Sequence, residues 1–360
     1  MGRARTPITV LAVGLAALAC RVGHAESGAE LYAEACASCH GADGRGRPEG
    51  SRIEVPLPDF SDCAFVTAEA TGNWAKLVRS GGPALGLSAQ MPAFGAALDE
   101  SQILAILAYV RGFCRDPAWP IGDLNYRRGQ LVTKAFPENE VVLTAAHAGA
   151  RGRRETEAEL SVERRLGPRA QLEVGVPLAV VDGDAAAPIT GAGDVAVSYG
   201  HVLAASAATG GILSAGVDCV LPTGNRRHGV GSGTLTMAPR LLGAGPLGPL
   251  VVQAQVQADL PVDPDRADRQ MVYGVGVGLP LAPSKRAVVP AIELEQTHAI
   301  ASDVRAATLL APQVYLPLSR SGHVALSVGG VVPVAGTRPF DWQARAFLLW
   351  DYADGPFWRW

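Results

Sequence analysis

The sequence predicts a multidomain chain in which an all-α domain precedes an all-β antiparallel domain of about twelve strands. Two observations predict this division. Apolar residues recur with helical spacing up to about residue 113, whereas beyond residue 138 they alternate with polar or small residues. Residues 117–137, between these parts, contain stiffening prolines and few periodic apolar residues, as a linker does. A chain of 360 residues is long enough for two domains.

The first 25 residues have the composition of an export signal. Arg3 and Arg5 form a basic end, residues 8–19 are apolar, and Gly23-His24-Ala25 fits a small-x-small cleavage site. The apolar run is too short to remain as a membrane-spanning helix. We expect residues 1–25 to be a signal peptide that is cleaved near Ala25, so that the mature chain folds outside the cytoplasm.

Acylation of Cys20, as in a lipoprotein, is an alternative fate for the leader. The residues before it match that signal poorly, because Ala17 stands where a larger aliphatic side chain is usual.

The charge of the chain indicates which partners it does not have. The formal net charge is -3 and no basic run is present, so nucleic acid is not expected as a partner.

Residues 36–40 form the pattern Cys-x-x-Cys-His, which marks attachment of a c-type haem. Two thiols at this spacing reach the two vinyl groups of one porphyrin, while the next imidazole lies under the iron. We therefore expect Cys36 and Cys39 to form the thioethers and His40 to be the proximal iron ligand. Zinc sites and redox disulfides also use Cys-x-x-Cys. However, Cys63 and Cys114 stand alone and far apart, so they do not complete a zinc site.

Met91, within residues 90–94, is the expected second axial ligand of the iron. A thioether on the open face of the haem gives His/Met ligation, which raises the reduction potential. Core packing is the alternative role for a methionine. Of the other three methionines, Met1 belongs to the leader, and Met237 and Met271 lie in the strand-rich part.

Residues 26–116 resemble a class I cytochrome c domain. The resemblance rests on the helix before the haem motif, the Met-Pro loop and the closing helix at residues 98–113. It implies one covalent haem c and a role in electron transfer. In that family the first and last helices cross where a glycine meets an aromatic residue, and these roles fit Gly28, Tyr32, Ile106 and Tyr109.

The remaining cysteines depart from that family. Cys63 and Cys114 add a possible disulfide between the loop before Met91 and the end of the last helix, since an oxidising compartment permits it. Cys219 is then left over, and we expect it to be a small buried or lipid-facing hydrophobe.

Two further features are predicted within the first domain. Residues 41–58 are rich in Gly, Arg and Pro and form a loop, and residues 73–79 form a short helix. A proline carbonyl of that loop is expected to accept the hydrogen bond of the proximal imidazole. The candidates, which the sequence does not separate, are Pro48, Pro56 and Pro58.

Alternation with period two predicts the strands of the second domain, residues 138–360. It is clearest in residues 251–260, where Val and Ala alternate with Gln and Asp. Each segment is about as long as a tilted strand that crosses a bilayer. The twelve segments begin near residues 141, 156, 171, 194, 213, 234, 251, 273, 288, 307, 323 and 341.

A soluble barrel or sandwich would have the same period, but three features favour an outer-membrane barrel. The polar faces carry more Gln, Glu, Asp and Ser than a packed core can satisfy, as a wet lumen can. Short and long connections alternate along the chain. The chain also ends on Trp358-Arg359-Trp360, and a terminal aromatic residue is typical of such barrels.

Residues 138–360 resemble outer-membrane barrels grouped with the phenol-degradation transporter-like family. The resemblance rests on two short Gly-rich motifs, residues 193–200 and 221–225. It implies a small outer-membrane barrel without indicating its cargo.

Other polar residues are expected to have structural roles. The histidines are scattered and have no short ligand pairing, so we interpret them as strand or loop residues; they are His147, His201, His228, His298 and His323. Glu293 and Glu295 face one side of a strand, as paired acids of a hydrolase do, but here they are expected to line a polar lumen. Arg226, Arg227 and His228 form a small solvated basic loop.

These patterns predict a monohaem electron carrier rather than an enzyme, with its haem domain in the periplasm and its barrel in the outer membrane. The expected partners are periplasmic redox proteins and the outer membrane, with a small solute possible in the barrel. One alternative is an outer-membrane transporter or pore whose haem domain is a redox sensor or gate. The other is a haem-dependent oxidoreductase, which would need a labile iron site and a distal acid or base.

Overall fold

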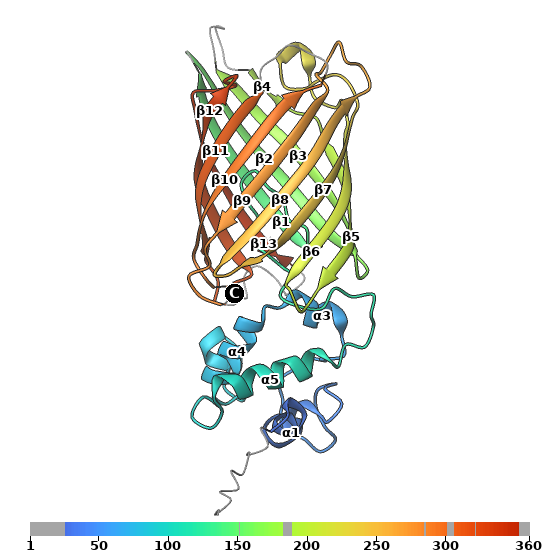
Figure 1. Cartoon of the computed structure of the whole chain (residues 1–360), viewed down its shortest axis with the longest axis vertical. Helices are drawn as coiled ribbons and strands as arrows, with labels where there is room; N and C mark the ends of the chain where they lie inside the picture. The colour runs from blue at the N-terminus through green and yellow to red at the C-terminus, as the bar shows by residue number, and fades with distance from the viewer. Residues whose placement is uncertain are drawn as a thin grey trace, which may run out of the picture.

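The computed structural model describes residues 26–150, 152–182, 189–283, 286–300, 306–320 and 322–352. The expected leader with Cys20 and the terminal residues 358–360 lie outside these ranges. The described chain has two parts, a small helical domain and a barrel of strands, and the helical domain lies against one end of the barrel (Figure 1). Among the described residues, no helix is long and apolar enough to cross a membrane.

The helical domain is built on five α-helices and a 3-10 turn. Capping boxes begin the first and last of the α-helices: Ser27 caps with Glu30, and Asp99 caps with Gln102. The elements are α1 (Gly28–Ala35), α2 (Ala37–His40), α3 (Cys63–Ala68), α4 (Thr71–Ser80), η1 (Gly82–Leu85) and α5 (Glu100–Arg111). The predicted helices at residues 73–79 and 98–113 are thus confirmed, with small changes of boundary.

The crossing of α1 and α5 depends on Gly28. A Cβ atom on Gly28 would lie 2.1 Å from the carbonyl oxygen of Ala105, so only glycine allows the two backbones to approach this closely. Beside it, the Tyr32 ring lies 5.4 Å from the ring of Tyr109. The expected glycine-aromatic crossing is confirmed.

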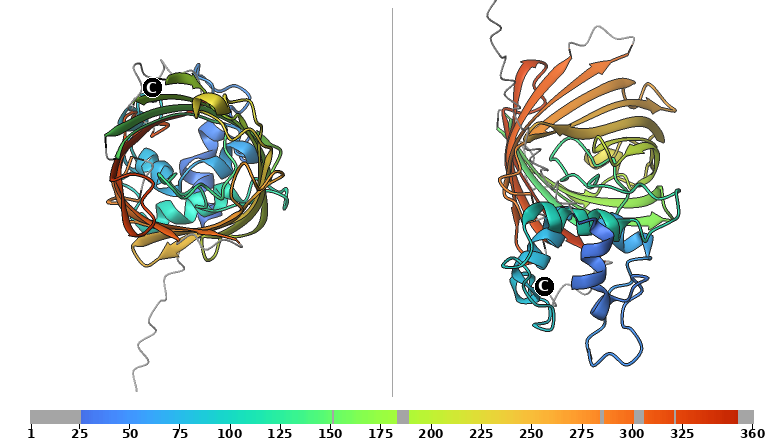
Figure 2. Two further views of the ribbon diagram at one scale, coloured as in Figure 1. Left: turned by 90° about the horizontal axis from the view of Figure 1, so that it is seen from above. Right: turned by 60° about the horizontal axis from the view of Figure 1, so that its bottom comes forward.

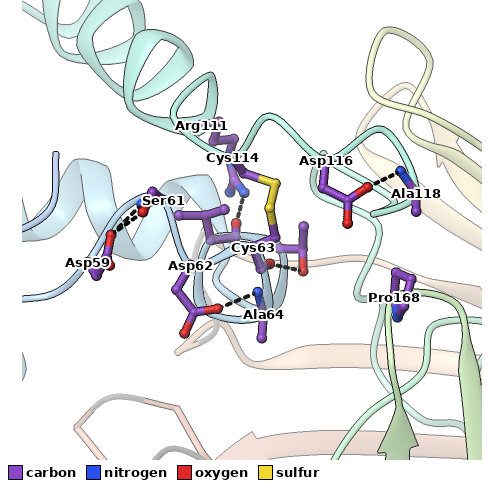
Figure 3. Close-up of a disulfide and its surroundings, with 12 residues drawn as sticks. Asp59, Ser61, Asp62, Cys63, Ala64, Arg111, Cys114, Asp116, Ala118 and Pro168 are labelled. Atoms are coloured by element: carbon purple, nitrogen blue, oxygen red, sulfur yellow. Dashed lines mark hydrogen bonds between the residues drawn. A yellow bond between two sulfur atoms is a disulfide. The ribbon is translucent and has the colours of Figure 1, made fainter. Parts of the chain in front are cut away.

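The predicted disulfide between Cys63 and Cys114 is present, with a Cα–Cα distance of 5.0 Å (Figure 3). It joins the start of α3 to the chain just after α5. Arg111 braces the same corner, because its guanidinium donates hydrogen bonds to the carbonyl oxygens of Val66 and Glu69. The corner between α3 and α4 is therefore held rigidly against α5.

Twelve antiparallel strands form a closed barrel, which confirms the predicted number. Each barrel strand pairs with the barrel strands before and after it in sequence, as β2 does with β3. Pairing of the first strand, β1, with the last, β13, closes the ring. A short extra strand, β4 (Ile189–Ala192), pairs only with β3. The barrel strands are β1 (Glu140–Ala150), β2 (Arg153–Leu166), β3 (Ala170–Asp182), β5 (Ala196–Ser206), β6 (Gly211–Val220), β7 (Thr236–Leu247), β8 (Leu250–Pro261), β9 (Gln270–Gly278), β10 (Val289–Ala299), β11 (Ala307–Pro317), β12 (Val324–Gly336) and β13 (Trp342–Asp351).

The alternation of residue types sorts the side chains between the two faces of the barrel. Apolar residues face outward and are exposed, as Leu178 (57%) and Leu241 (51%) illustrate. The intervening polar residues face the bore, where Glu163 and Glu293 are buried. The barrel wall is thus apolar on its outer face and polar on its inner face, the reverse of the distribution in a soluble protein.

The connections differ between the two ends of the barrel. At the end that meets the helical domain, the connections are residues 167–169, 207–210, 248–249, 279–288 and 318–323. At the other end lie the two longest, residues 183–195 and 221–235, the first of which contains β4. The helical domain therefore lies at the end with the shorter turns.

Candidate functional site

The haem motif forms one tight helical segment directly after α1. Cys36 ends α1 and begins α2, and its carbonyl oxygen accepts hydrogen bonds from the N–H groups of Cys39 (3.1 Å) and His40 (2.9 Å). Both thiols are free. The local turn thus presents Cys36, Cys39 and His40 from a single rigid unit of backbone.

Burial sets the protonation states of this motif. Burial and, to a smaller extent, the neighbouring Cys39 raise the pKa of Cys36 to about 11, so its thiol is protonated at neutral pH. The free Cys36 thiol is therefore a poor nucleophile. Burial also lowers the pKa of His40, so its imidazole is neutral, the state that an iron ligand requires.

His40 carries an unsatisfied buried atom. In the described part of the chain, its Nδ1 has no hydrogen-bond partner, and so none of the carbonyls of Pro48, Pro56 and Pro58 accepts from it. A metal-ligating imidazole usually donates its other ring N–H to a carbonyl oxygen. The expected proline partner of His40 is therefore not borne out.

Aromatic side chains form the wall beside His40. The Phe60 ring lies 5.1 Å from the imidazole, and Phe60 also contacts Trp74, with ring centroids 6.0 Å apart. Cys36 and Met91 pack against the same apolar core. The structure thus brings Cys36, His40 and Met91 to one aromatic-lined core.

The loop that carries Met91 is closed by its own backbone. The N–H of Met91 donates to the carbonyl oxygen of Ser88 (3.2 Å), and its carbonyl oxygen accepts from Gly82 N–H (3.0 Å). A Cβ atom on Gly82 would lie 2.0 Å from the Ser88 carbonyl oxygen, so glycine is required there. The residues present therefore fit a haem c held by Cys36, Cys39, His40 and Met91, which would supply a one-electron couple.

Residues 122–138 form the second candidate site. They have no regular secondary structure and run inside the barrel, where the teal-green trace lies within the ring of strands (Figures 1 and 2). We call this segment the luminal strap. The sequence predicts a stiff linker here, whereas in the structure the segment is packed against the inner wall of the barrel.

Glu293 on β10 binds the backbone at the tip of the luminal strap. Its carboxylate accepts three hydrogen bonds from the strap, from the N–H groups of Gln130 (2.8 Å), Leu131 (2.7 Å) and Val132 (2.7 Å), and a fourth from the side chain of Gln313 on β11. Charge-assisted bonds of this kind are among the stronger hydrogen bonds in proteins. Glu293 lines the lumen as expected, and it also holds the strap.

Glutamines of β8 bind the strap backbone from a second direction. The amide of Gln255 accepts from Thr133 N–H (3.2 Å) and donates to the Leu131 carbonyl oxygen (3.1 Å), as a neighbouring strand would. Gln253 donates to the Arg127 carbonyl oxygen (2.7 Å). Side chains on the polar face of β8 therefore satisfy the backbone of the luminal strap, as the backbone of a neighbouring strand would in a sheet.

Cations of the strap meet acids of the wall. Arg128 pairs with Glu163 on β2 and lies 3.7 Å from a carboxylate oxygen of Glu173 on β3. Lys134 pairs with Glu140 on β1 (2.5 Å). The charges of the strap thus compensate acids that the wall buries, as buried charges require.

Glycines on β9 leave room for the strap. A Cβ atom on Gly274 would lie 3.0 Å from a methyl carbon of Val132. Another on Gly276 would lie 3.1 Å from the Glu293 side chain. The wall is therefore recessed where the strap is closest.

The helical domain is fastened to the barrel mouth by polar contacts. His323, just before β12, places Nε2 3.1 Å from a carboxylate oxygen of Glu69 and Nδ1 3.4 Å from one of Asp351. At the start of the strap, Asp123 accepts from Thr71 N–H (2.7 Å) and pairs with Arg111 (3.2 Å). The corner between α3 and α4 is thus the docking point.

A cavity of about 400 Å³ lies between the docked domain, the strap and strands β8–β11. Its lining includes Thr67 and Glu69 of the helical domain, Tyr126 and Val132 of the strap, and Val289 of β10. The strap therefore forms part of the cavity wall.

Sequence reasoning did not identify the strap or the role of His323. The signals were present but ambiguous. Gly274 and Gly276 fit the small positions of any strand, and Arg128 and Lys134 lie in a segment without periodicity. Their partners are more than thirty residues away for Arg128 and on a different element for Lys134, so no local pattern joins them.

Fold and site together define the class: a c-type cytochrome domain joined to a closed antiparallel β-barrel. Residues 23–110 match the family model described as cytochrome c oxidase, cbb3-type, subunit III. The helical part of the chain is therefore a cytochrome c domain, as its motif predicts.

The barrel is similar to solved structures of outer-membrane proteins. One is an outer membrane channel from Pseudomonas putida F1, at 16% identity over 62% of this chain and 99% of that chain, with a TM-score of 0.48. The NanC porin is similar at 10% identity over 58% of this chain and 97% of its own, with a TM-score of 0.42. The KdgM porin is similar at 10% identity over 59% and 99%, with a TM-score of 0.40.

Proposed function

We propose that this protein is a monohaem electron carrier of the periplasm, mounted on a barrel in the outer membrane. The observation that carries the proposal is the pair of free thiols at Cys36 and Cys39 beside the buried neutral imidazole of His40, in a cytochrome c domain. His40 and Met91 would hold the iron, and Cys36 and Cys39 would attach the porphyrin. A haem held in this way would supply a one-electron couple without binding a substrate at the iron.

The outer surface of the barrel supports a membrane location. Large apolar side chains on many strands are exposed there, among them Leu143, Leu160, Leu213, Val256 and Ile292. Soluble proteins rarely expose a continuous apolar surface of this kind, because water contact with it is unfavourable. Lipid is the solvent in which such a surface is stable.

The connections of the barrel support the orientation. Outer-membrane barrels have short turns on the periplasmic side and longer loops outside the cell. The helical domain lies at the end with the shorter turns, and Arg169 in one of them donates to the Ala118 carbonyl oxygen (2.7 Å). We therefore place the haem domain in the periplasm, where soluble redox proteins reach it.

The test is to express the full chain in cells that mature c-type haems, separate the membranes and stain for covalent haem. A haem-staining band of full-length mass in the outer-membrane fraction, with a Soret band that survives acid-acetone extraction, is expected. The matched variant is Cys36→Ser/Cys39→Ser, in which staining should be lost while the barrel still reaches the membrane. Absence of covalent haem in the native chain would overturn the redox role.

A further inference from the structure

We propose that the luminal strap is a gate: it closes the bore of the barrel, and release of its tip from Glu293 and Gln255 opens a path for ions and small solutes. The proposal concerns the barrel and is independent of the redox role. In this role the segment that links the two domains regulates the barrel.

The first argument is that the strap lies across the bore. Near its tip, Arg128 reaches Glu163 and Glu173 on β2 and β3, while the following residues are bound by Glu293 on β10 and Gln255 on β8. The sheet order places β2 and β3 far from β8 and β10 around the ring. Contacts to separate parts of the wall require the chain to cross the space between them.

Further contacts extend this crossing. The side chain of Gln130 donates to Ser327 Oγ on β12 (2.9 Å). Ser214 Oγ on β6 donates to the Ala135 carbonyl oxygen (2.6 Å). The strap is thus held from several sides, and it leaves the cavity of about 400 Å³ on the side of the helical domain.

The second argument is that the ends and the tip of the strap are held differently. Leu124 and Phe136, near the two ends, are almost fully buried and pack with apolar residues of β5, β6 and β7. The tip, residues 129–133, donates four backbone N–H groups to oxygens of wall side chains, and its one almost fully buried apolar side chain is Val132. Water in a wet lumen can replace hydrogen bonds, whereas withdrawal of buried apolar side chains is unfavourable. With only Val132 to withdraw, the tip is therefore easier to release than the two apolar ends.

The third argument is that the wall is shaped for one position of the tip. Val132 fits the recess that Gly274 leaves on β9, and the N–H of Gly129 donates to the Val132 carbonyl oxygen (3.1 Å), closing the turn. A Cβ atom on Gly129 would lie 2.4 Å from a carboxylate oxygen of Glu293. A segment that only spanned a distance would not need such a fit.

The test is the KCl conductance of the full-length haem-loaded protein in planar bilayers. The releasing variant is Glu293→Gln/Gln255→Ala, which weakens both sets of bonds to the tip. We expect its open probability to be at least about tenfold higher than that of the native chain, a factor that corresponds to about 1.4 kcal/mol. The native chain should remain mostly closed.

The matched control is Glu295→Gln/Gln257→Ala. These residues lie two positions farther along the same strands on the same face, and Gln257 donates to Asp259 rather than to the strap. It makes the same chemical changes within the same lumen, and its conductance should stay within about twofold of the native value. An equal rise in control and releasing variant would overturn the proposal.

A covalent lock gives a second, independent readout. Val132→Cys/Gly274→Cys, added to the releasing variant, joins the tip to β9, and Gln255→Ala clears the side chain that would crowd the new Cβ. Oxidation should return conductance to the native level and reduction should restore it, with the releasing variant alone treated in the same way as a control. Conductance that is unaffected by the lock, or a native chain as open as the releasing variant, would show that the strap is not a gate.

Discussion

His323, at the foot of β12, lies with its Nε2 atom 3.1 Å from a carboxylate oxygen of Glu69 in the haem domain. Both side chains are almost fully buried, and Asp351 at the end of β13 lies on the other side of the ring. The barrel and the haem domain thus share a polar contact from which water is largely excluded. Contacts of this kind gain strength from the low local dielectric.

Replacement of His323 by Ala should weaken docking of the haem domain. The change leaves two carboxyl groups without the imidazole between them, and we expect a cost of about 1–3 kcal/mol. The measurement is the midpoint of urea unfolding followed at the Soret band, in a cycle of His323→Ala, Glu69→Ala and the double variant. His298→Ala, in which an exposed histidine is removed, is the control. Effects that simply add would show that the two residues do not interact.

Replacement of Met91 by Ala should lower the reduction potential. Loss of the proposed thioether ligand would leave the iron with one protein ligand, and axial ligation sets haem potentials over a range of about 0.8 V. The variant should also bind cyanide readily. Potentiometric titration and the ligand-field absorption of the ferric protein are the measurements. Spectra and potential that match those of the native protein would remove Met91 from the ligand set, and the remote Met271→Ala is the control.

Loss of the disulfide should destabilise the haem domain. Cys63 and Cys114 are separated by 51 positions, and a bond over such a loop typically contributes about 2–4 kcal/mol by restricting the unfolded chain. We expect Cys63→Ser/Cys114→Ser to unfold at lower urea concentration in measurements at the Soret band. Cys219→Ser, a free cysteine on β6, should leave the midpoint unchanged. Equal midpoints for all three proteins would show that the bond is dispensable.

Asp99 should make the stability of the haem domain depend on pH in the acid range. Hydrogen bonds from the Ser101 hydroxyl and the Gln102 N–H hold its pKa below the usual value of 3.8. The folded state thus binds the proton more weakly than the unfolded state, so the stabilisation is present above that usual value and is lost as the pH falls through the lower one. Urea midpoints of the native chain and Asp99→Ala should differ near neutral pH and converge in acid.

The control for that experiment is Glu34→Ala, which removes an exposed acid from α1. The gap between this variant and the native chain should change less with pH. A gap for Asp99→Ala that stays constant into strong acid would show that its carboxylate charge does not contribute.

The strands could be predicted from the sequence because their signal is local. In residues 251–260 every second side chain is apolar, and the structure turns these to the outside and the glutamines to the bore. The haem motif is local too, since Cys36, Cys39 and His40 lie within one turn. Each of these features depends on the spacing of neighbours, which a single sequence displays directly.

The luminal strap could not be predicted because its contacts are remote and one-sided. The bonds from residues 130–132 to Glu293 span more than 160 positions, and their donors are backbone groups that every residue possesses. The glutamines of the wall fit the prediction of a polar lumen, but the sequence does not show that they bind the strap. His323 escaped notice for the same reason, since Glu69 belongs to another domain.

The strap enters and leaves the barrel by the same mouth. Gly122 lies beside the turn at residues 207–210, and the N–H of Glu138 donates to Gln171 near the start of β3 (2.7 Å), so both ends stay at the rim that meets the helical domain. The strap is therefore a loop inserted into the barrel from one end, and the chain does not pass through the bore to the other end. Retraction would therefore require neither unzipping of the β1–β13 seam nor passage of a folded domain along the bore, and the barrel wall could remain intact throughout each cycle.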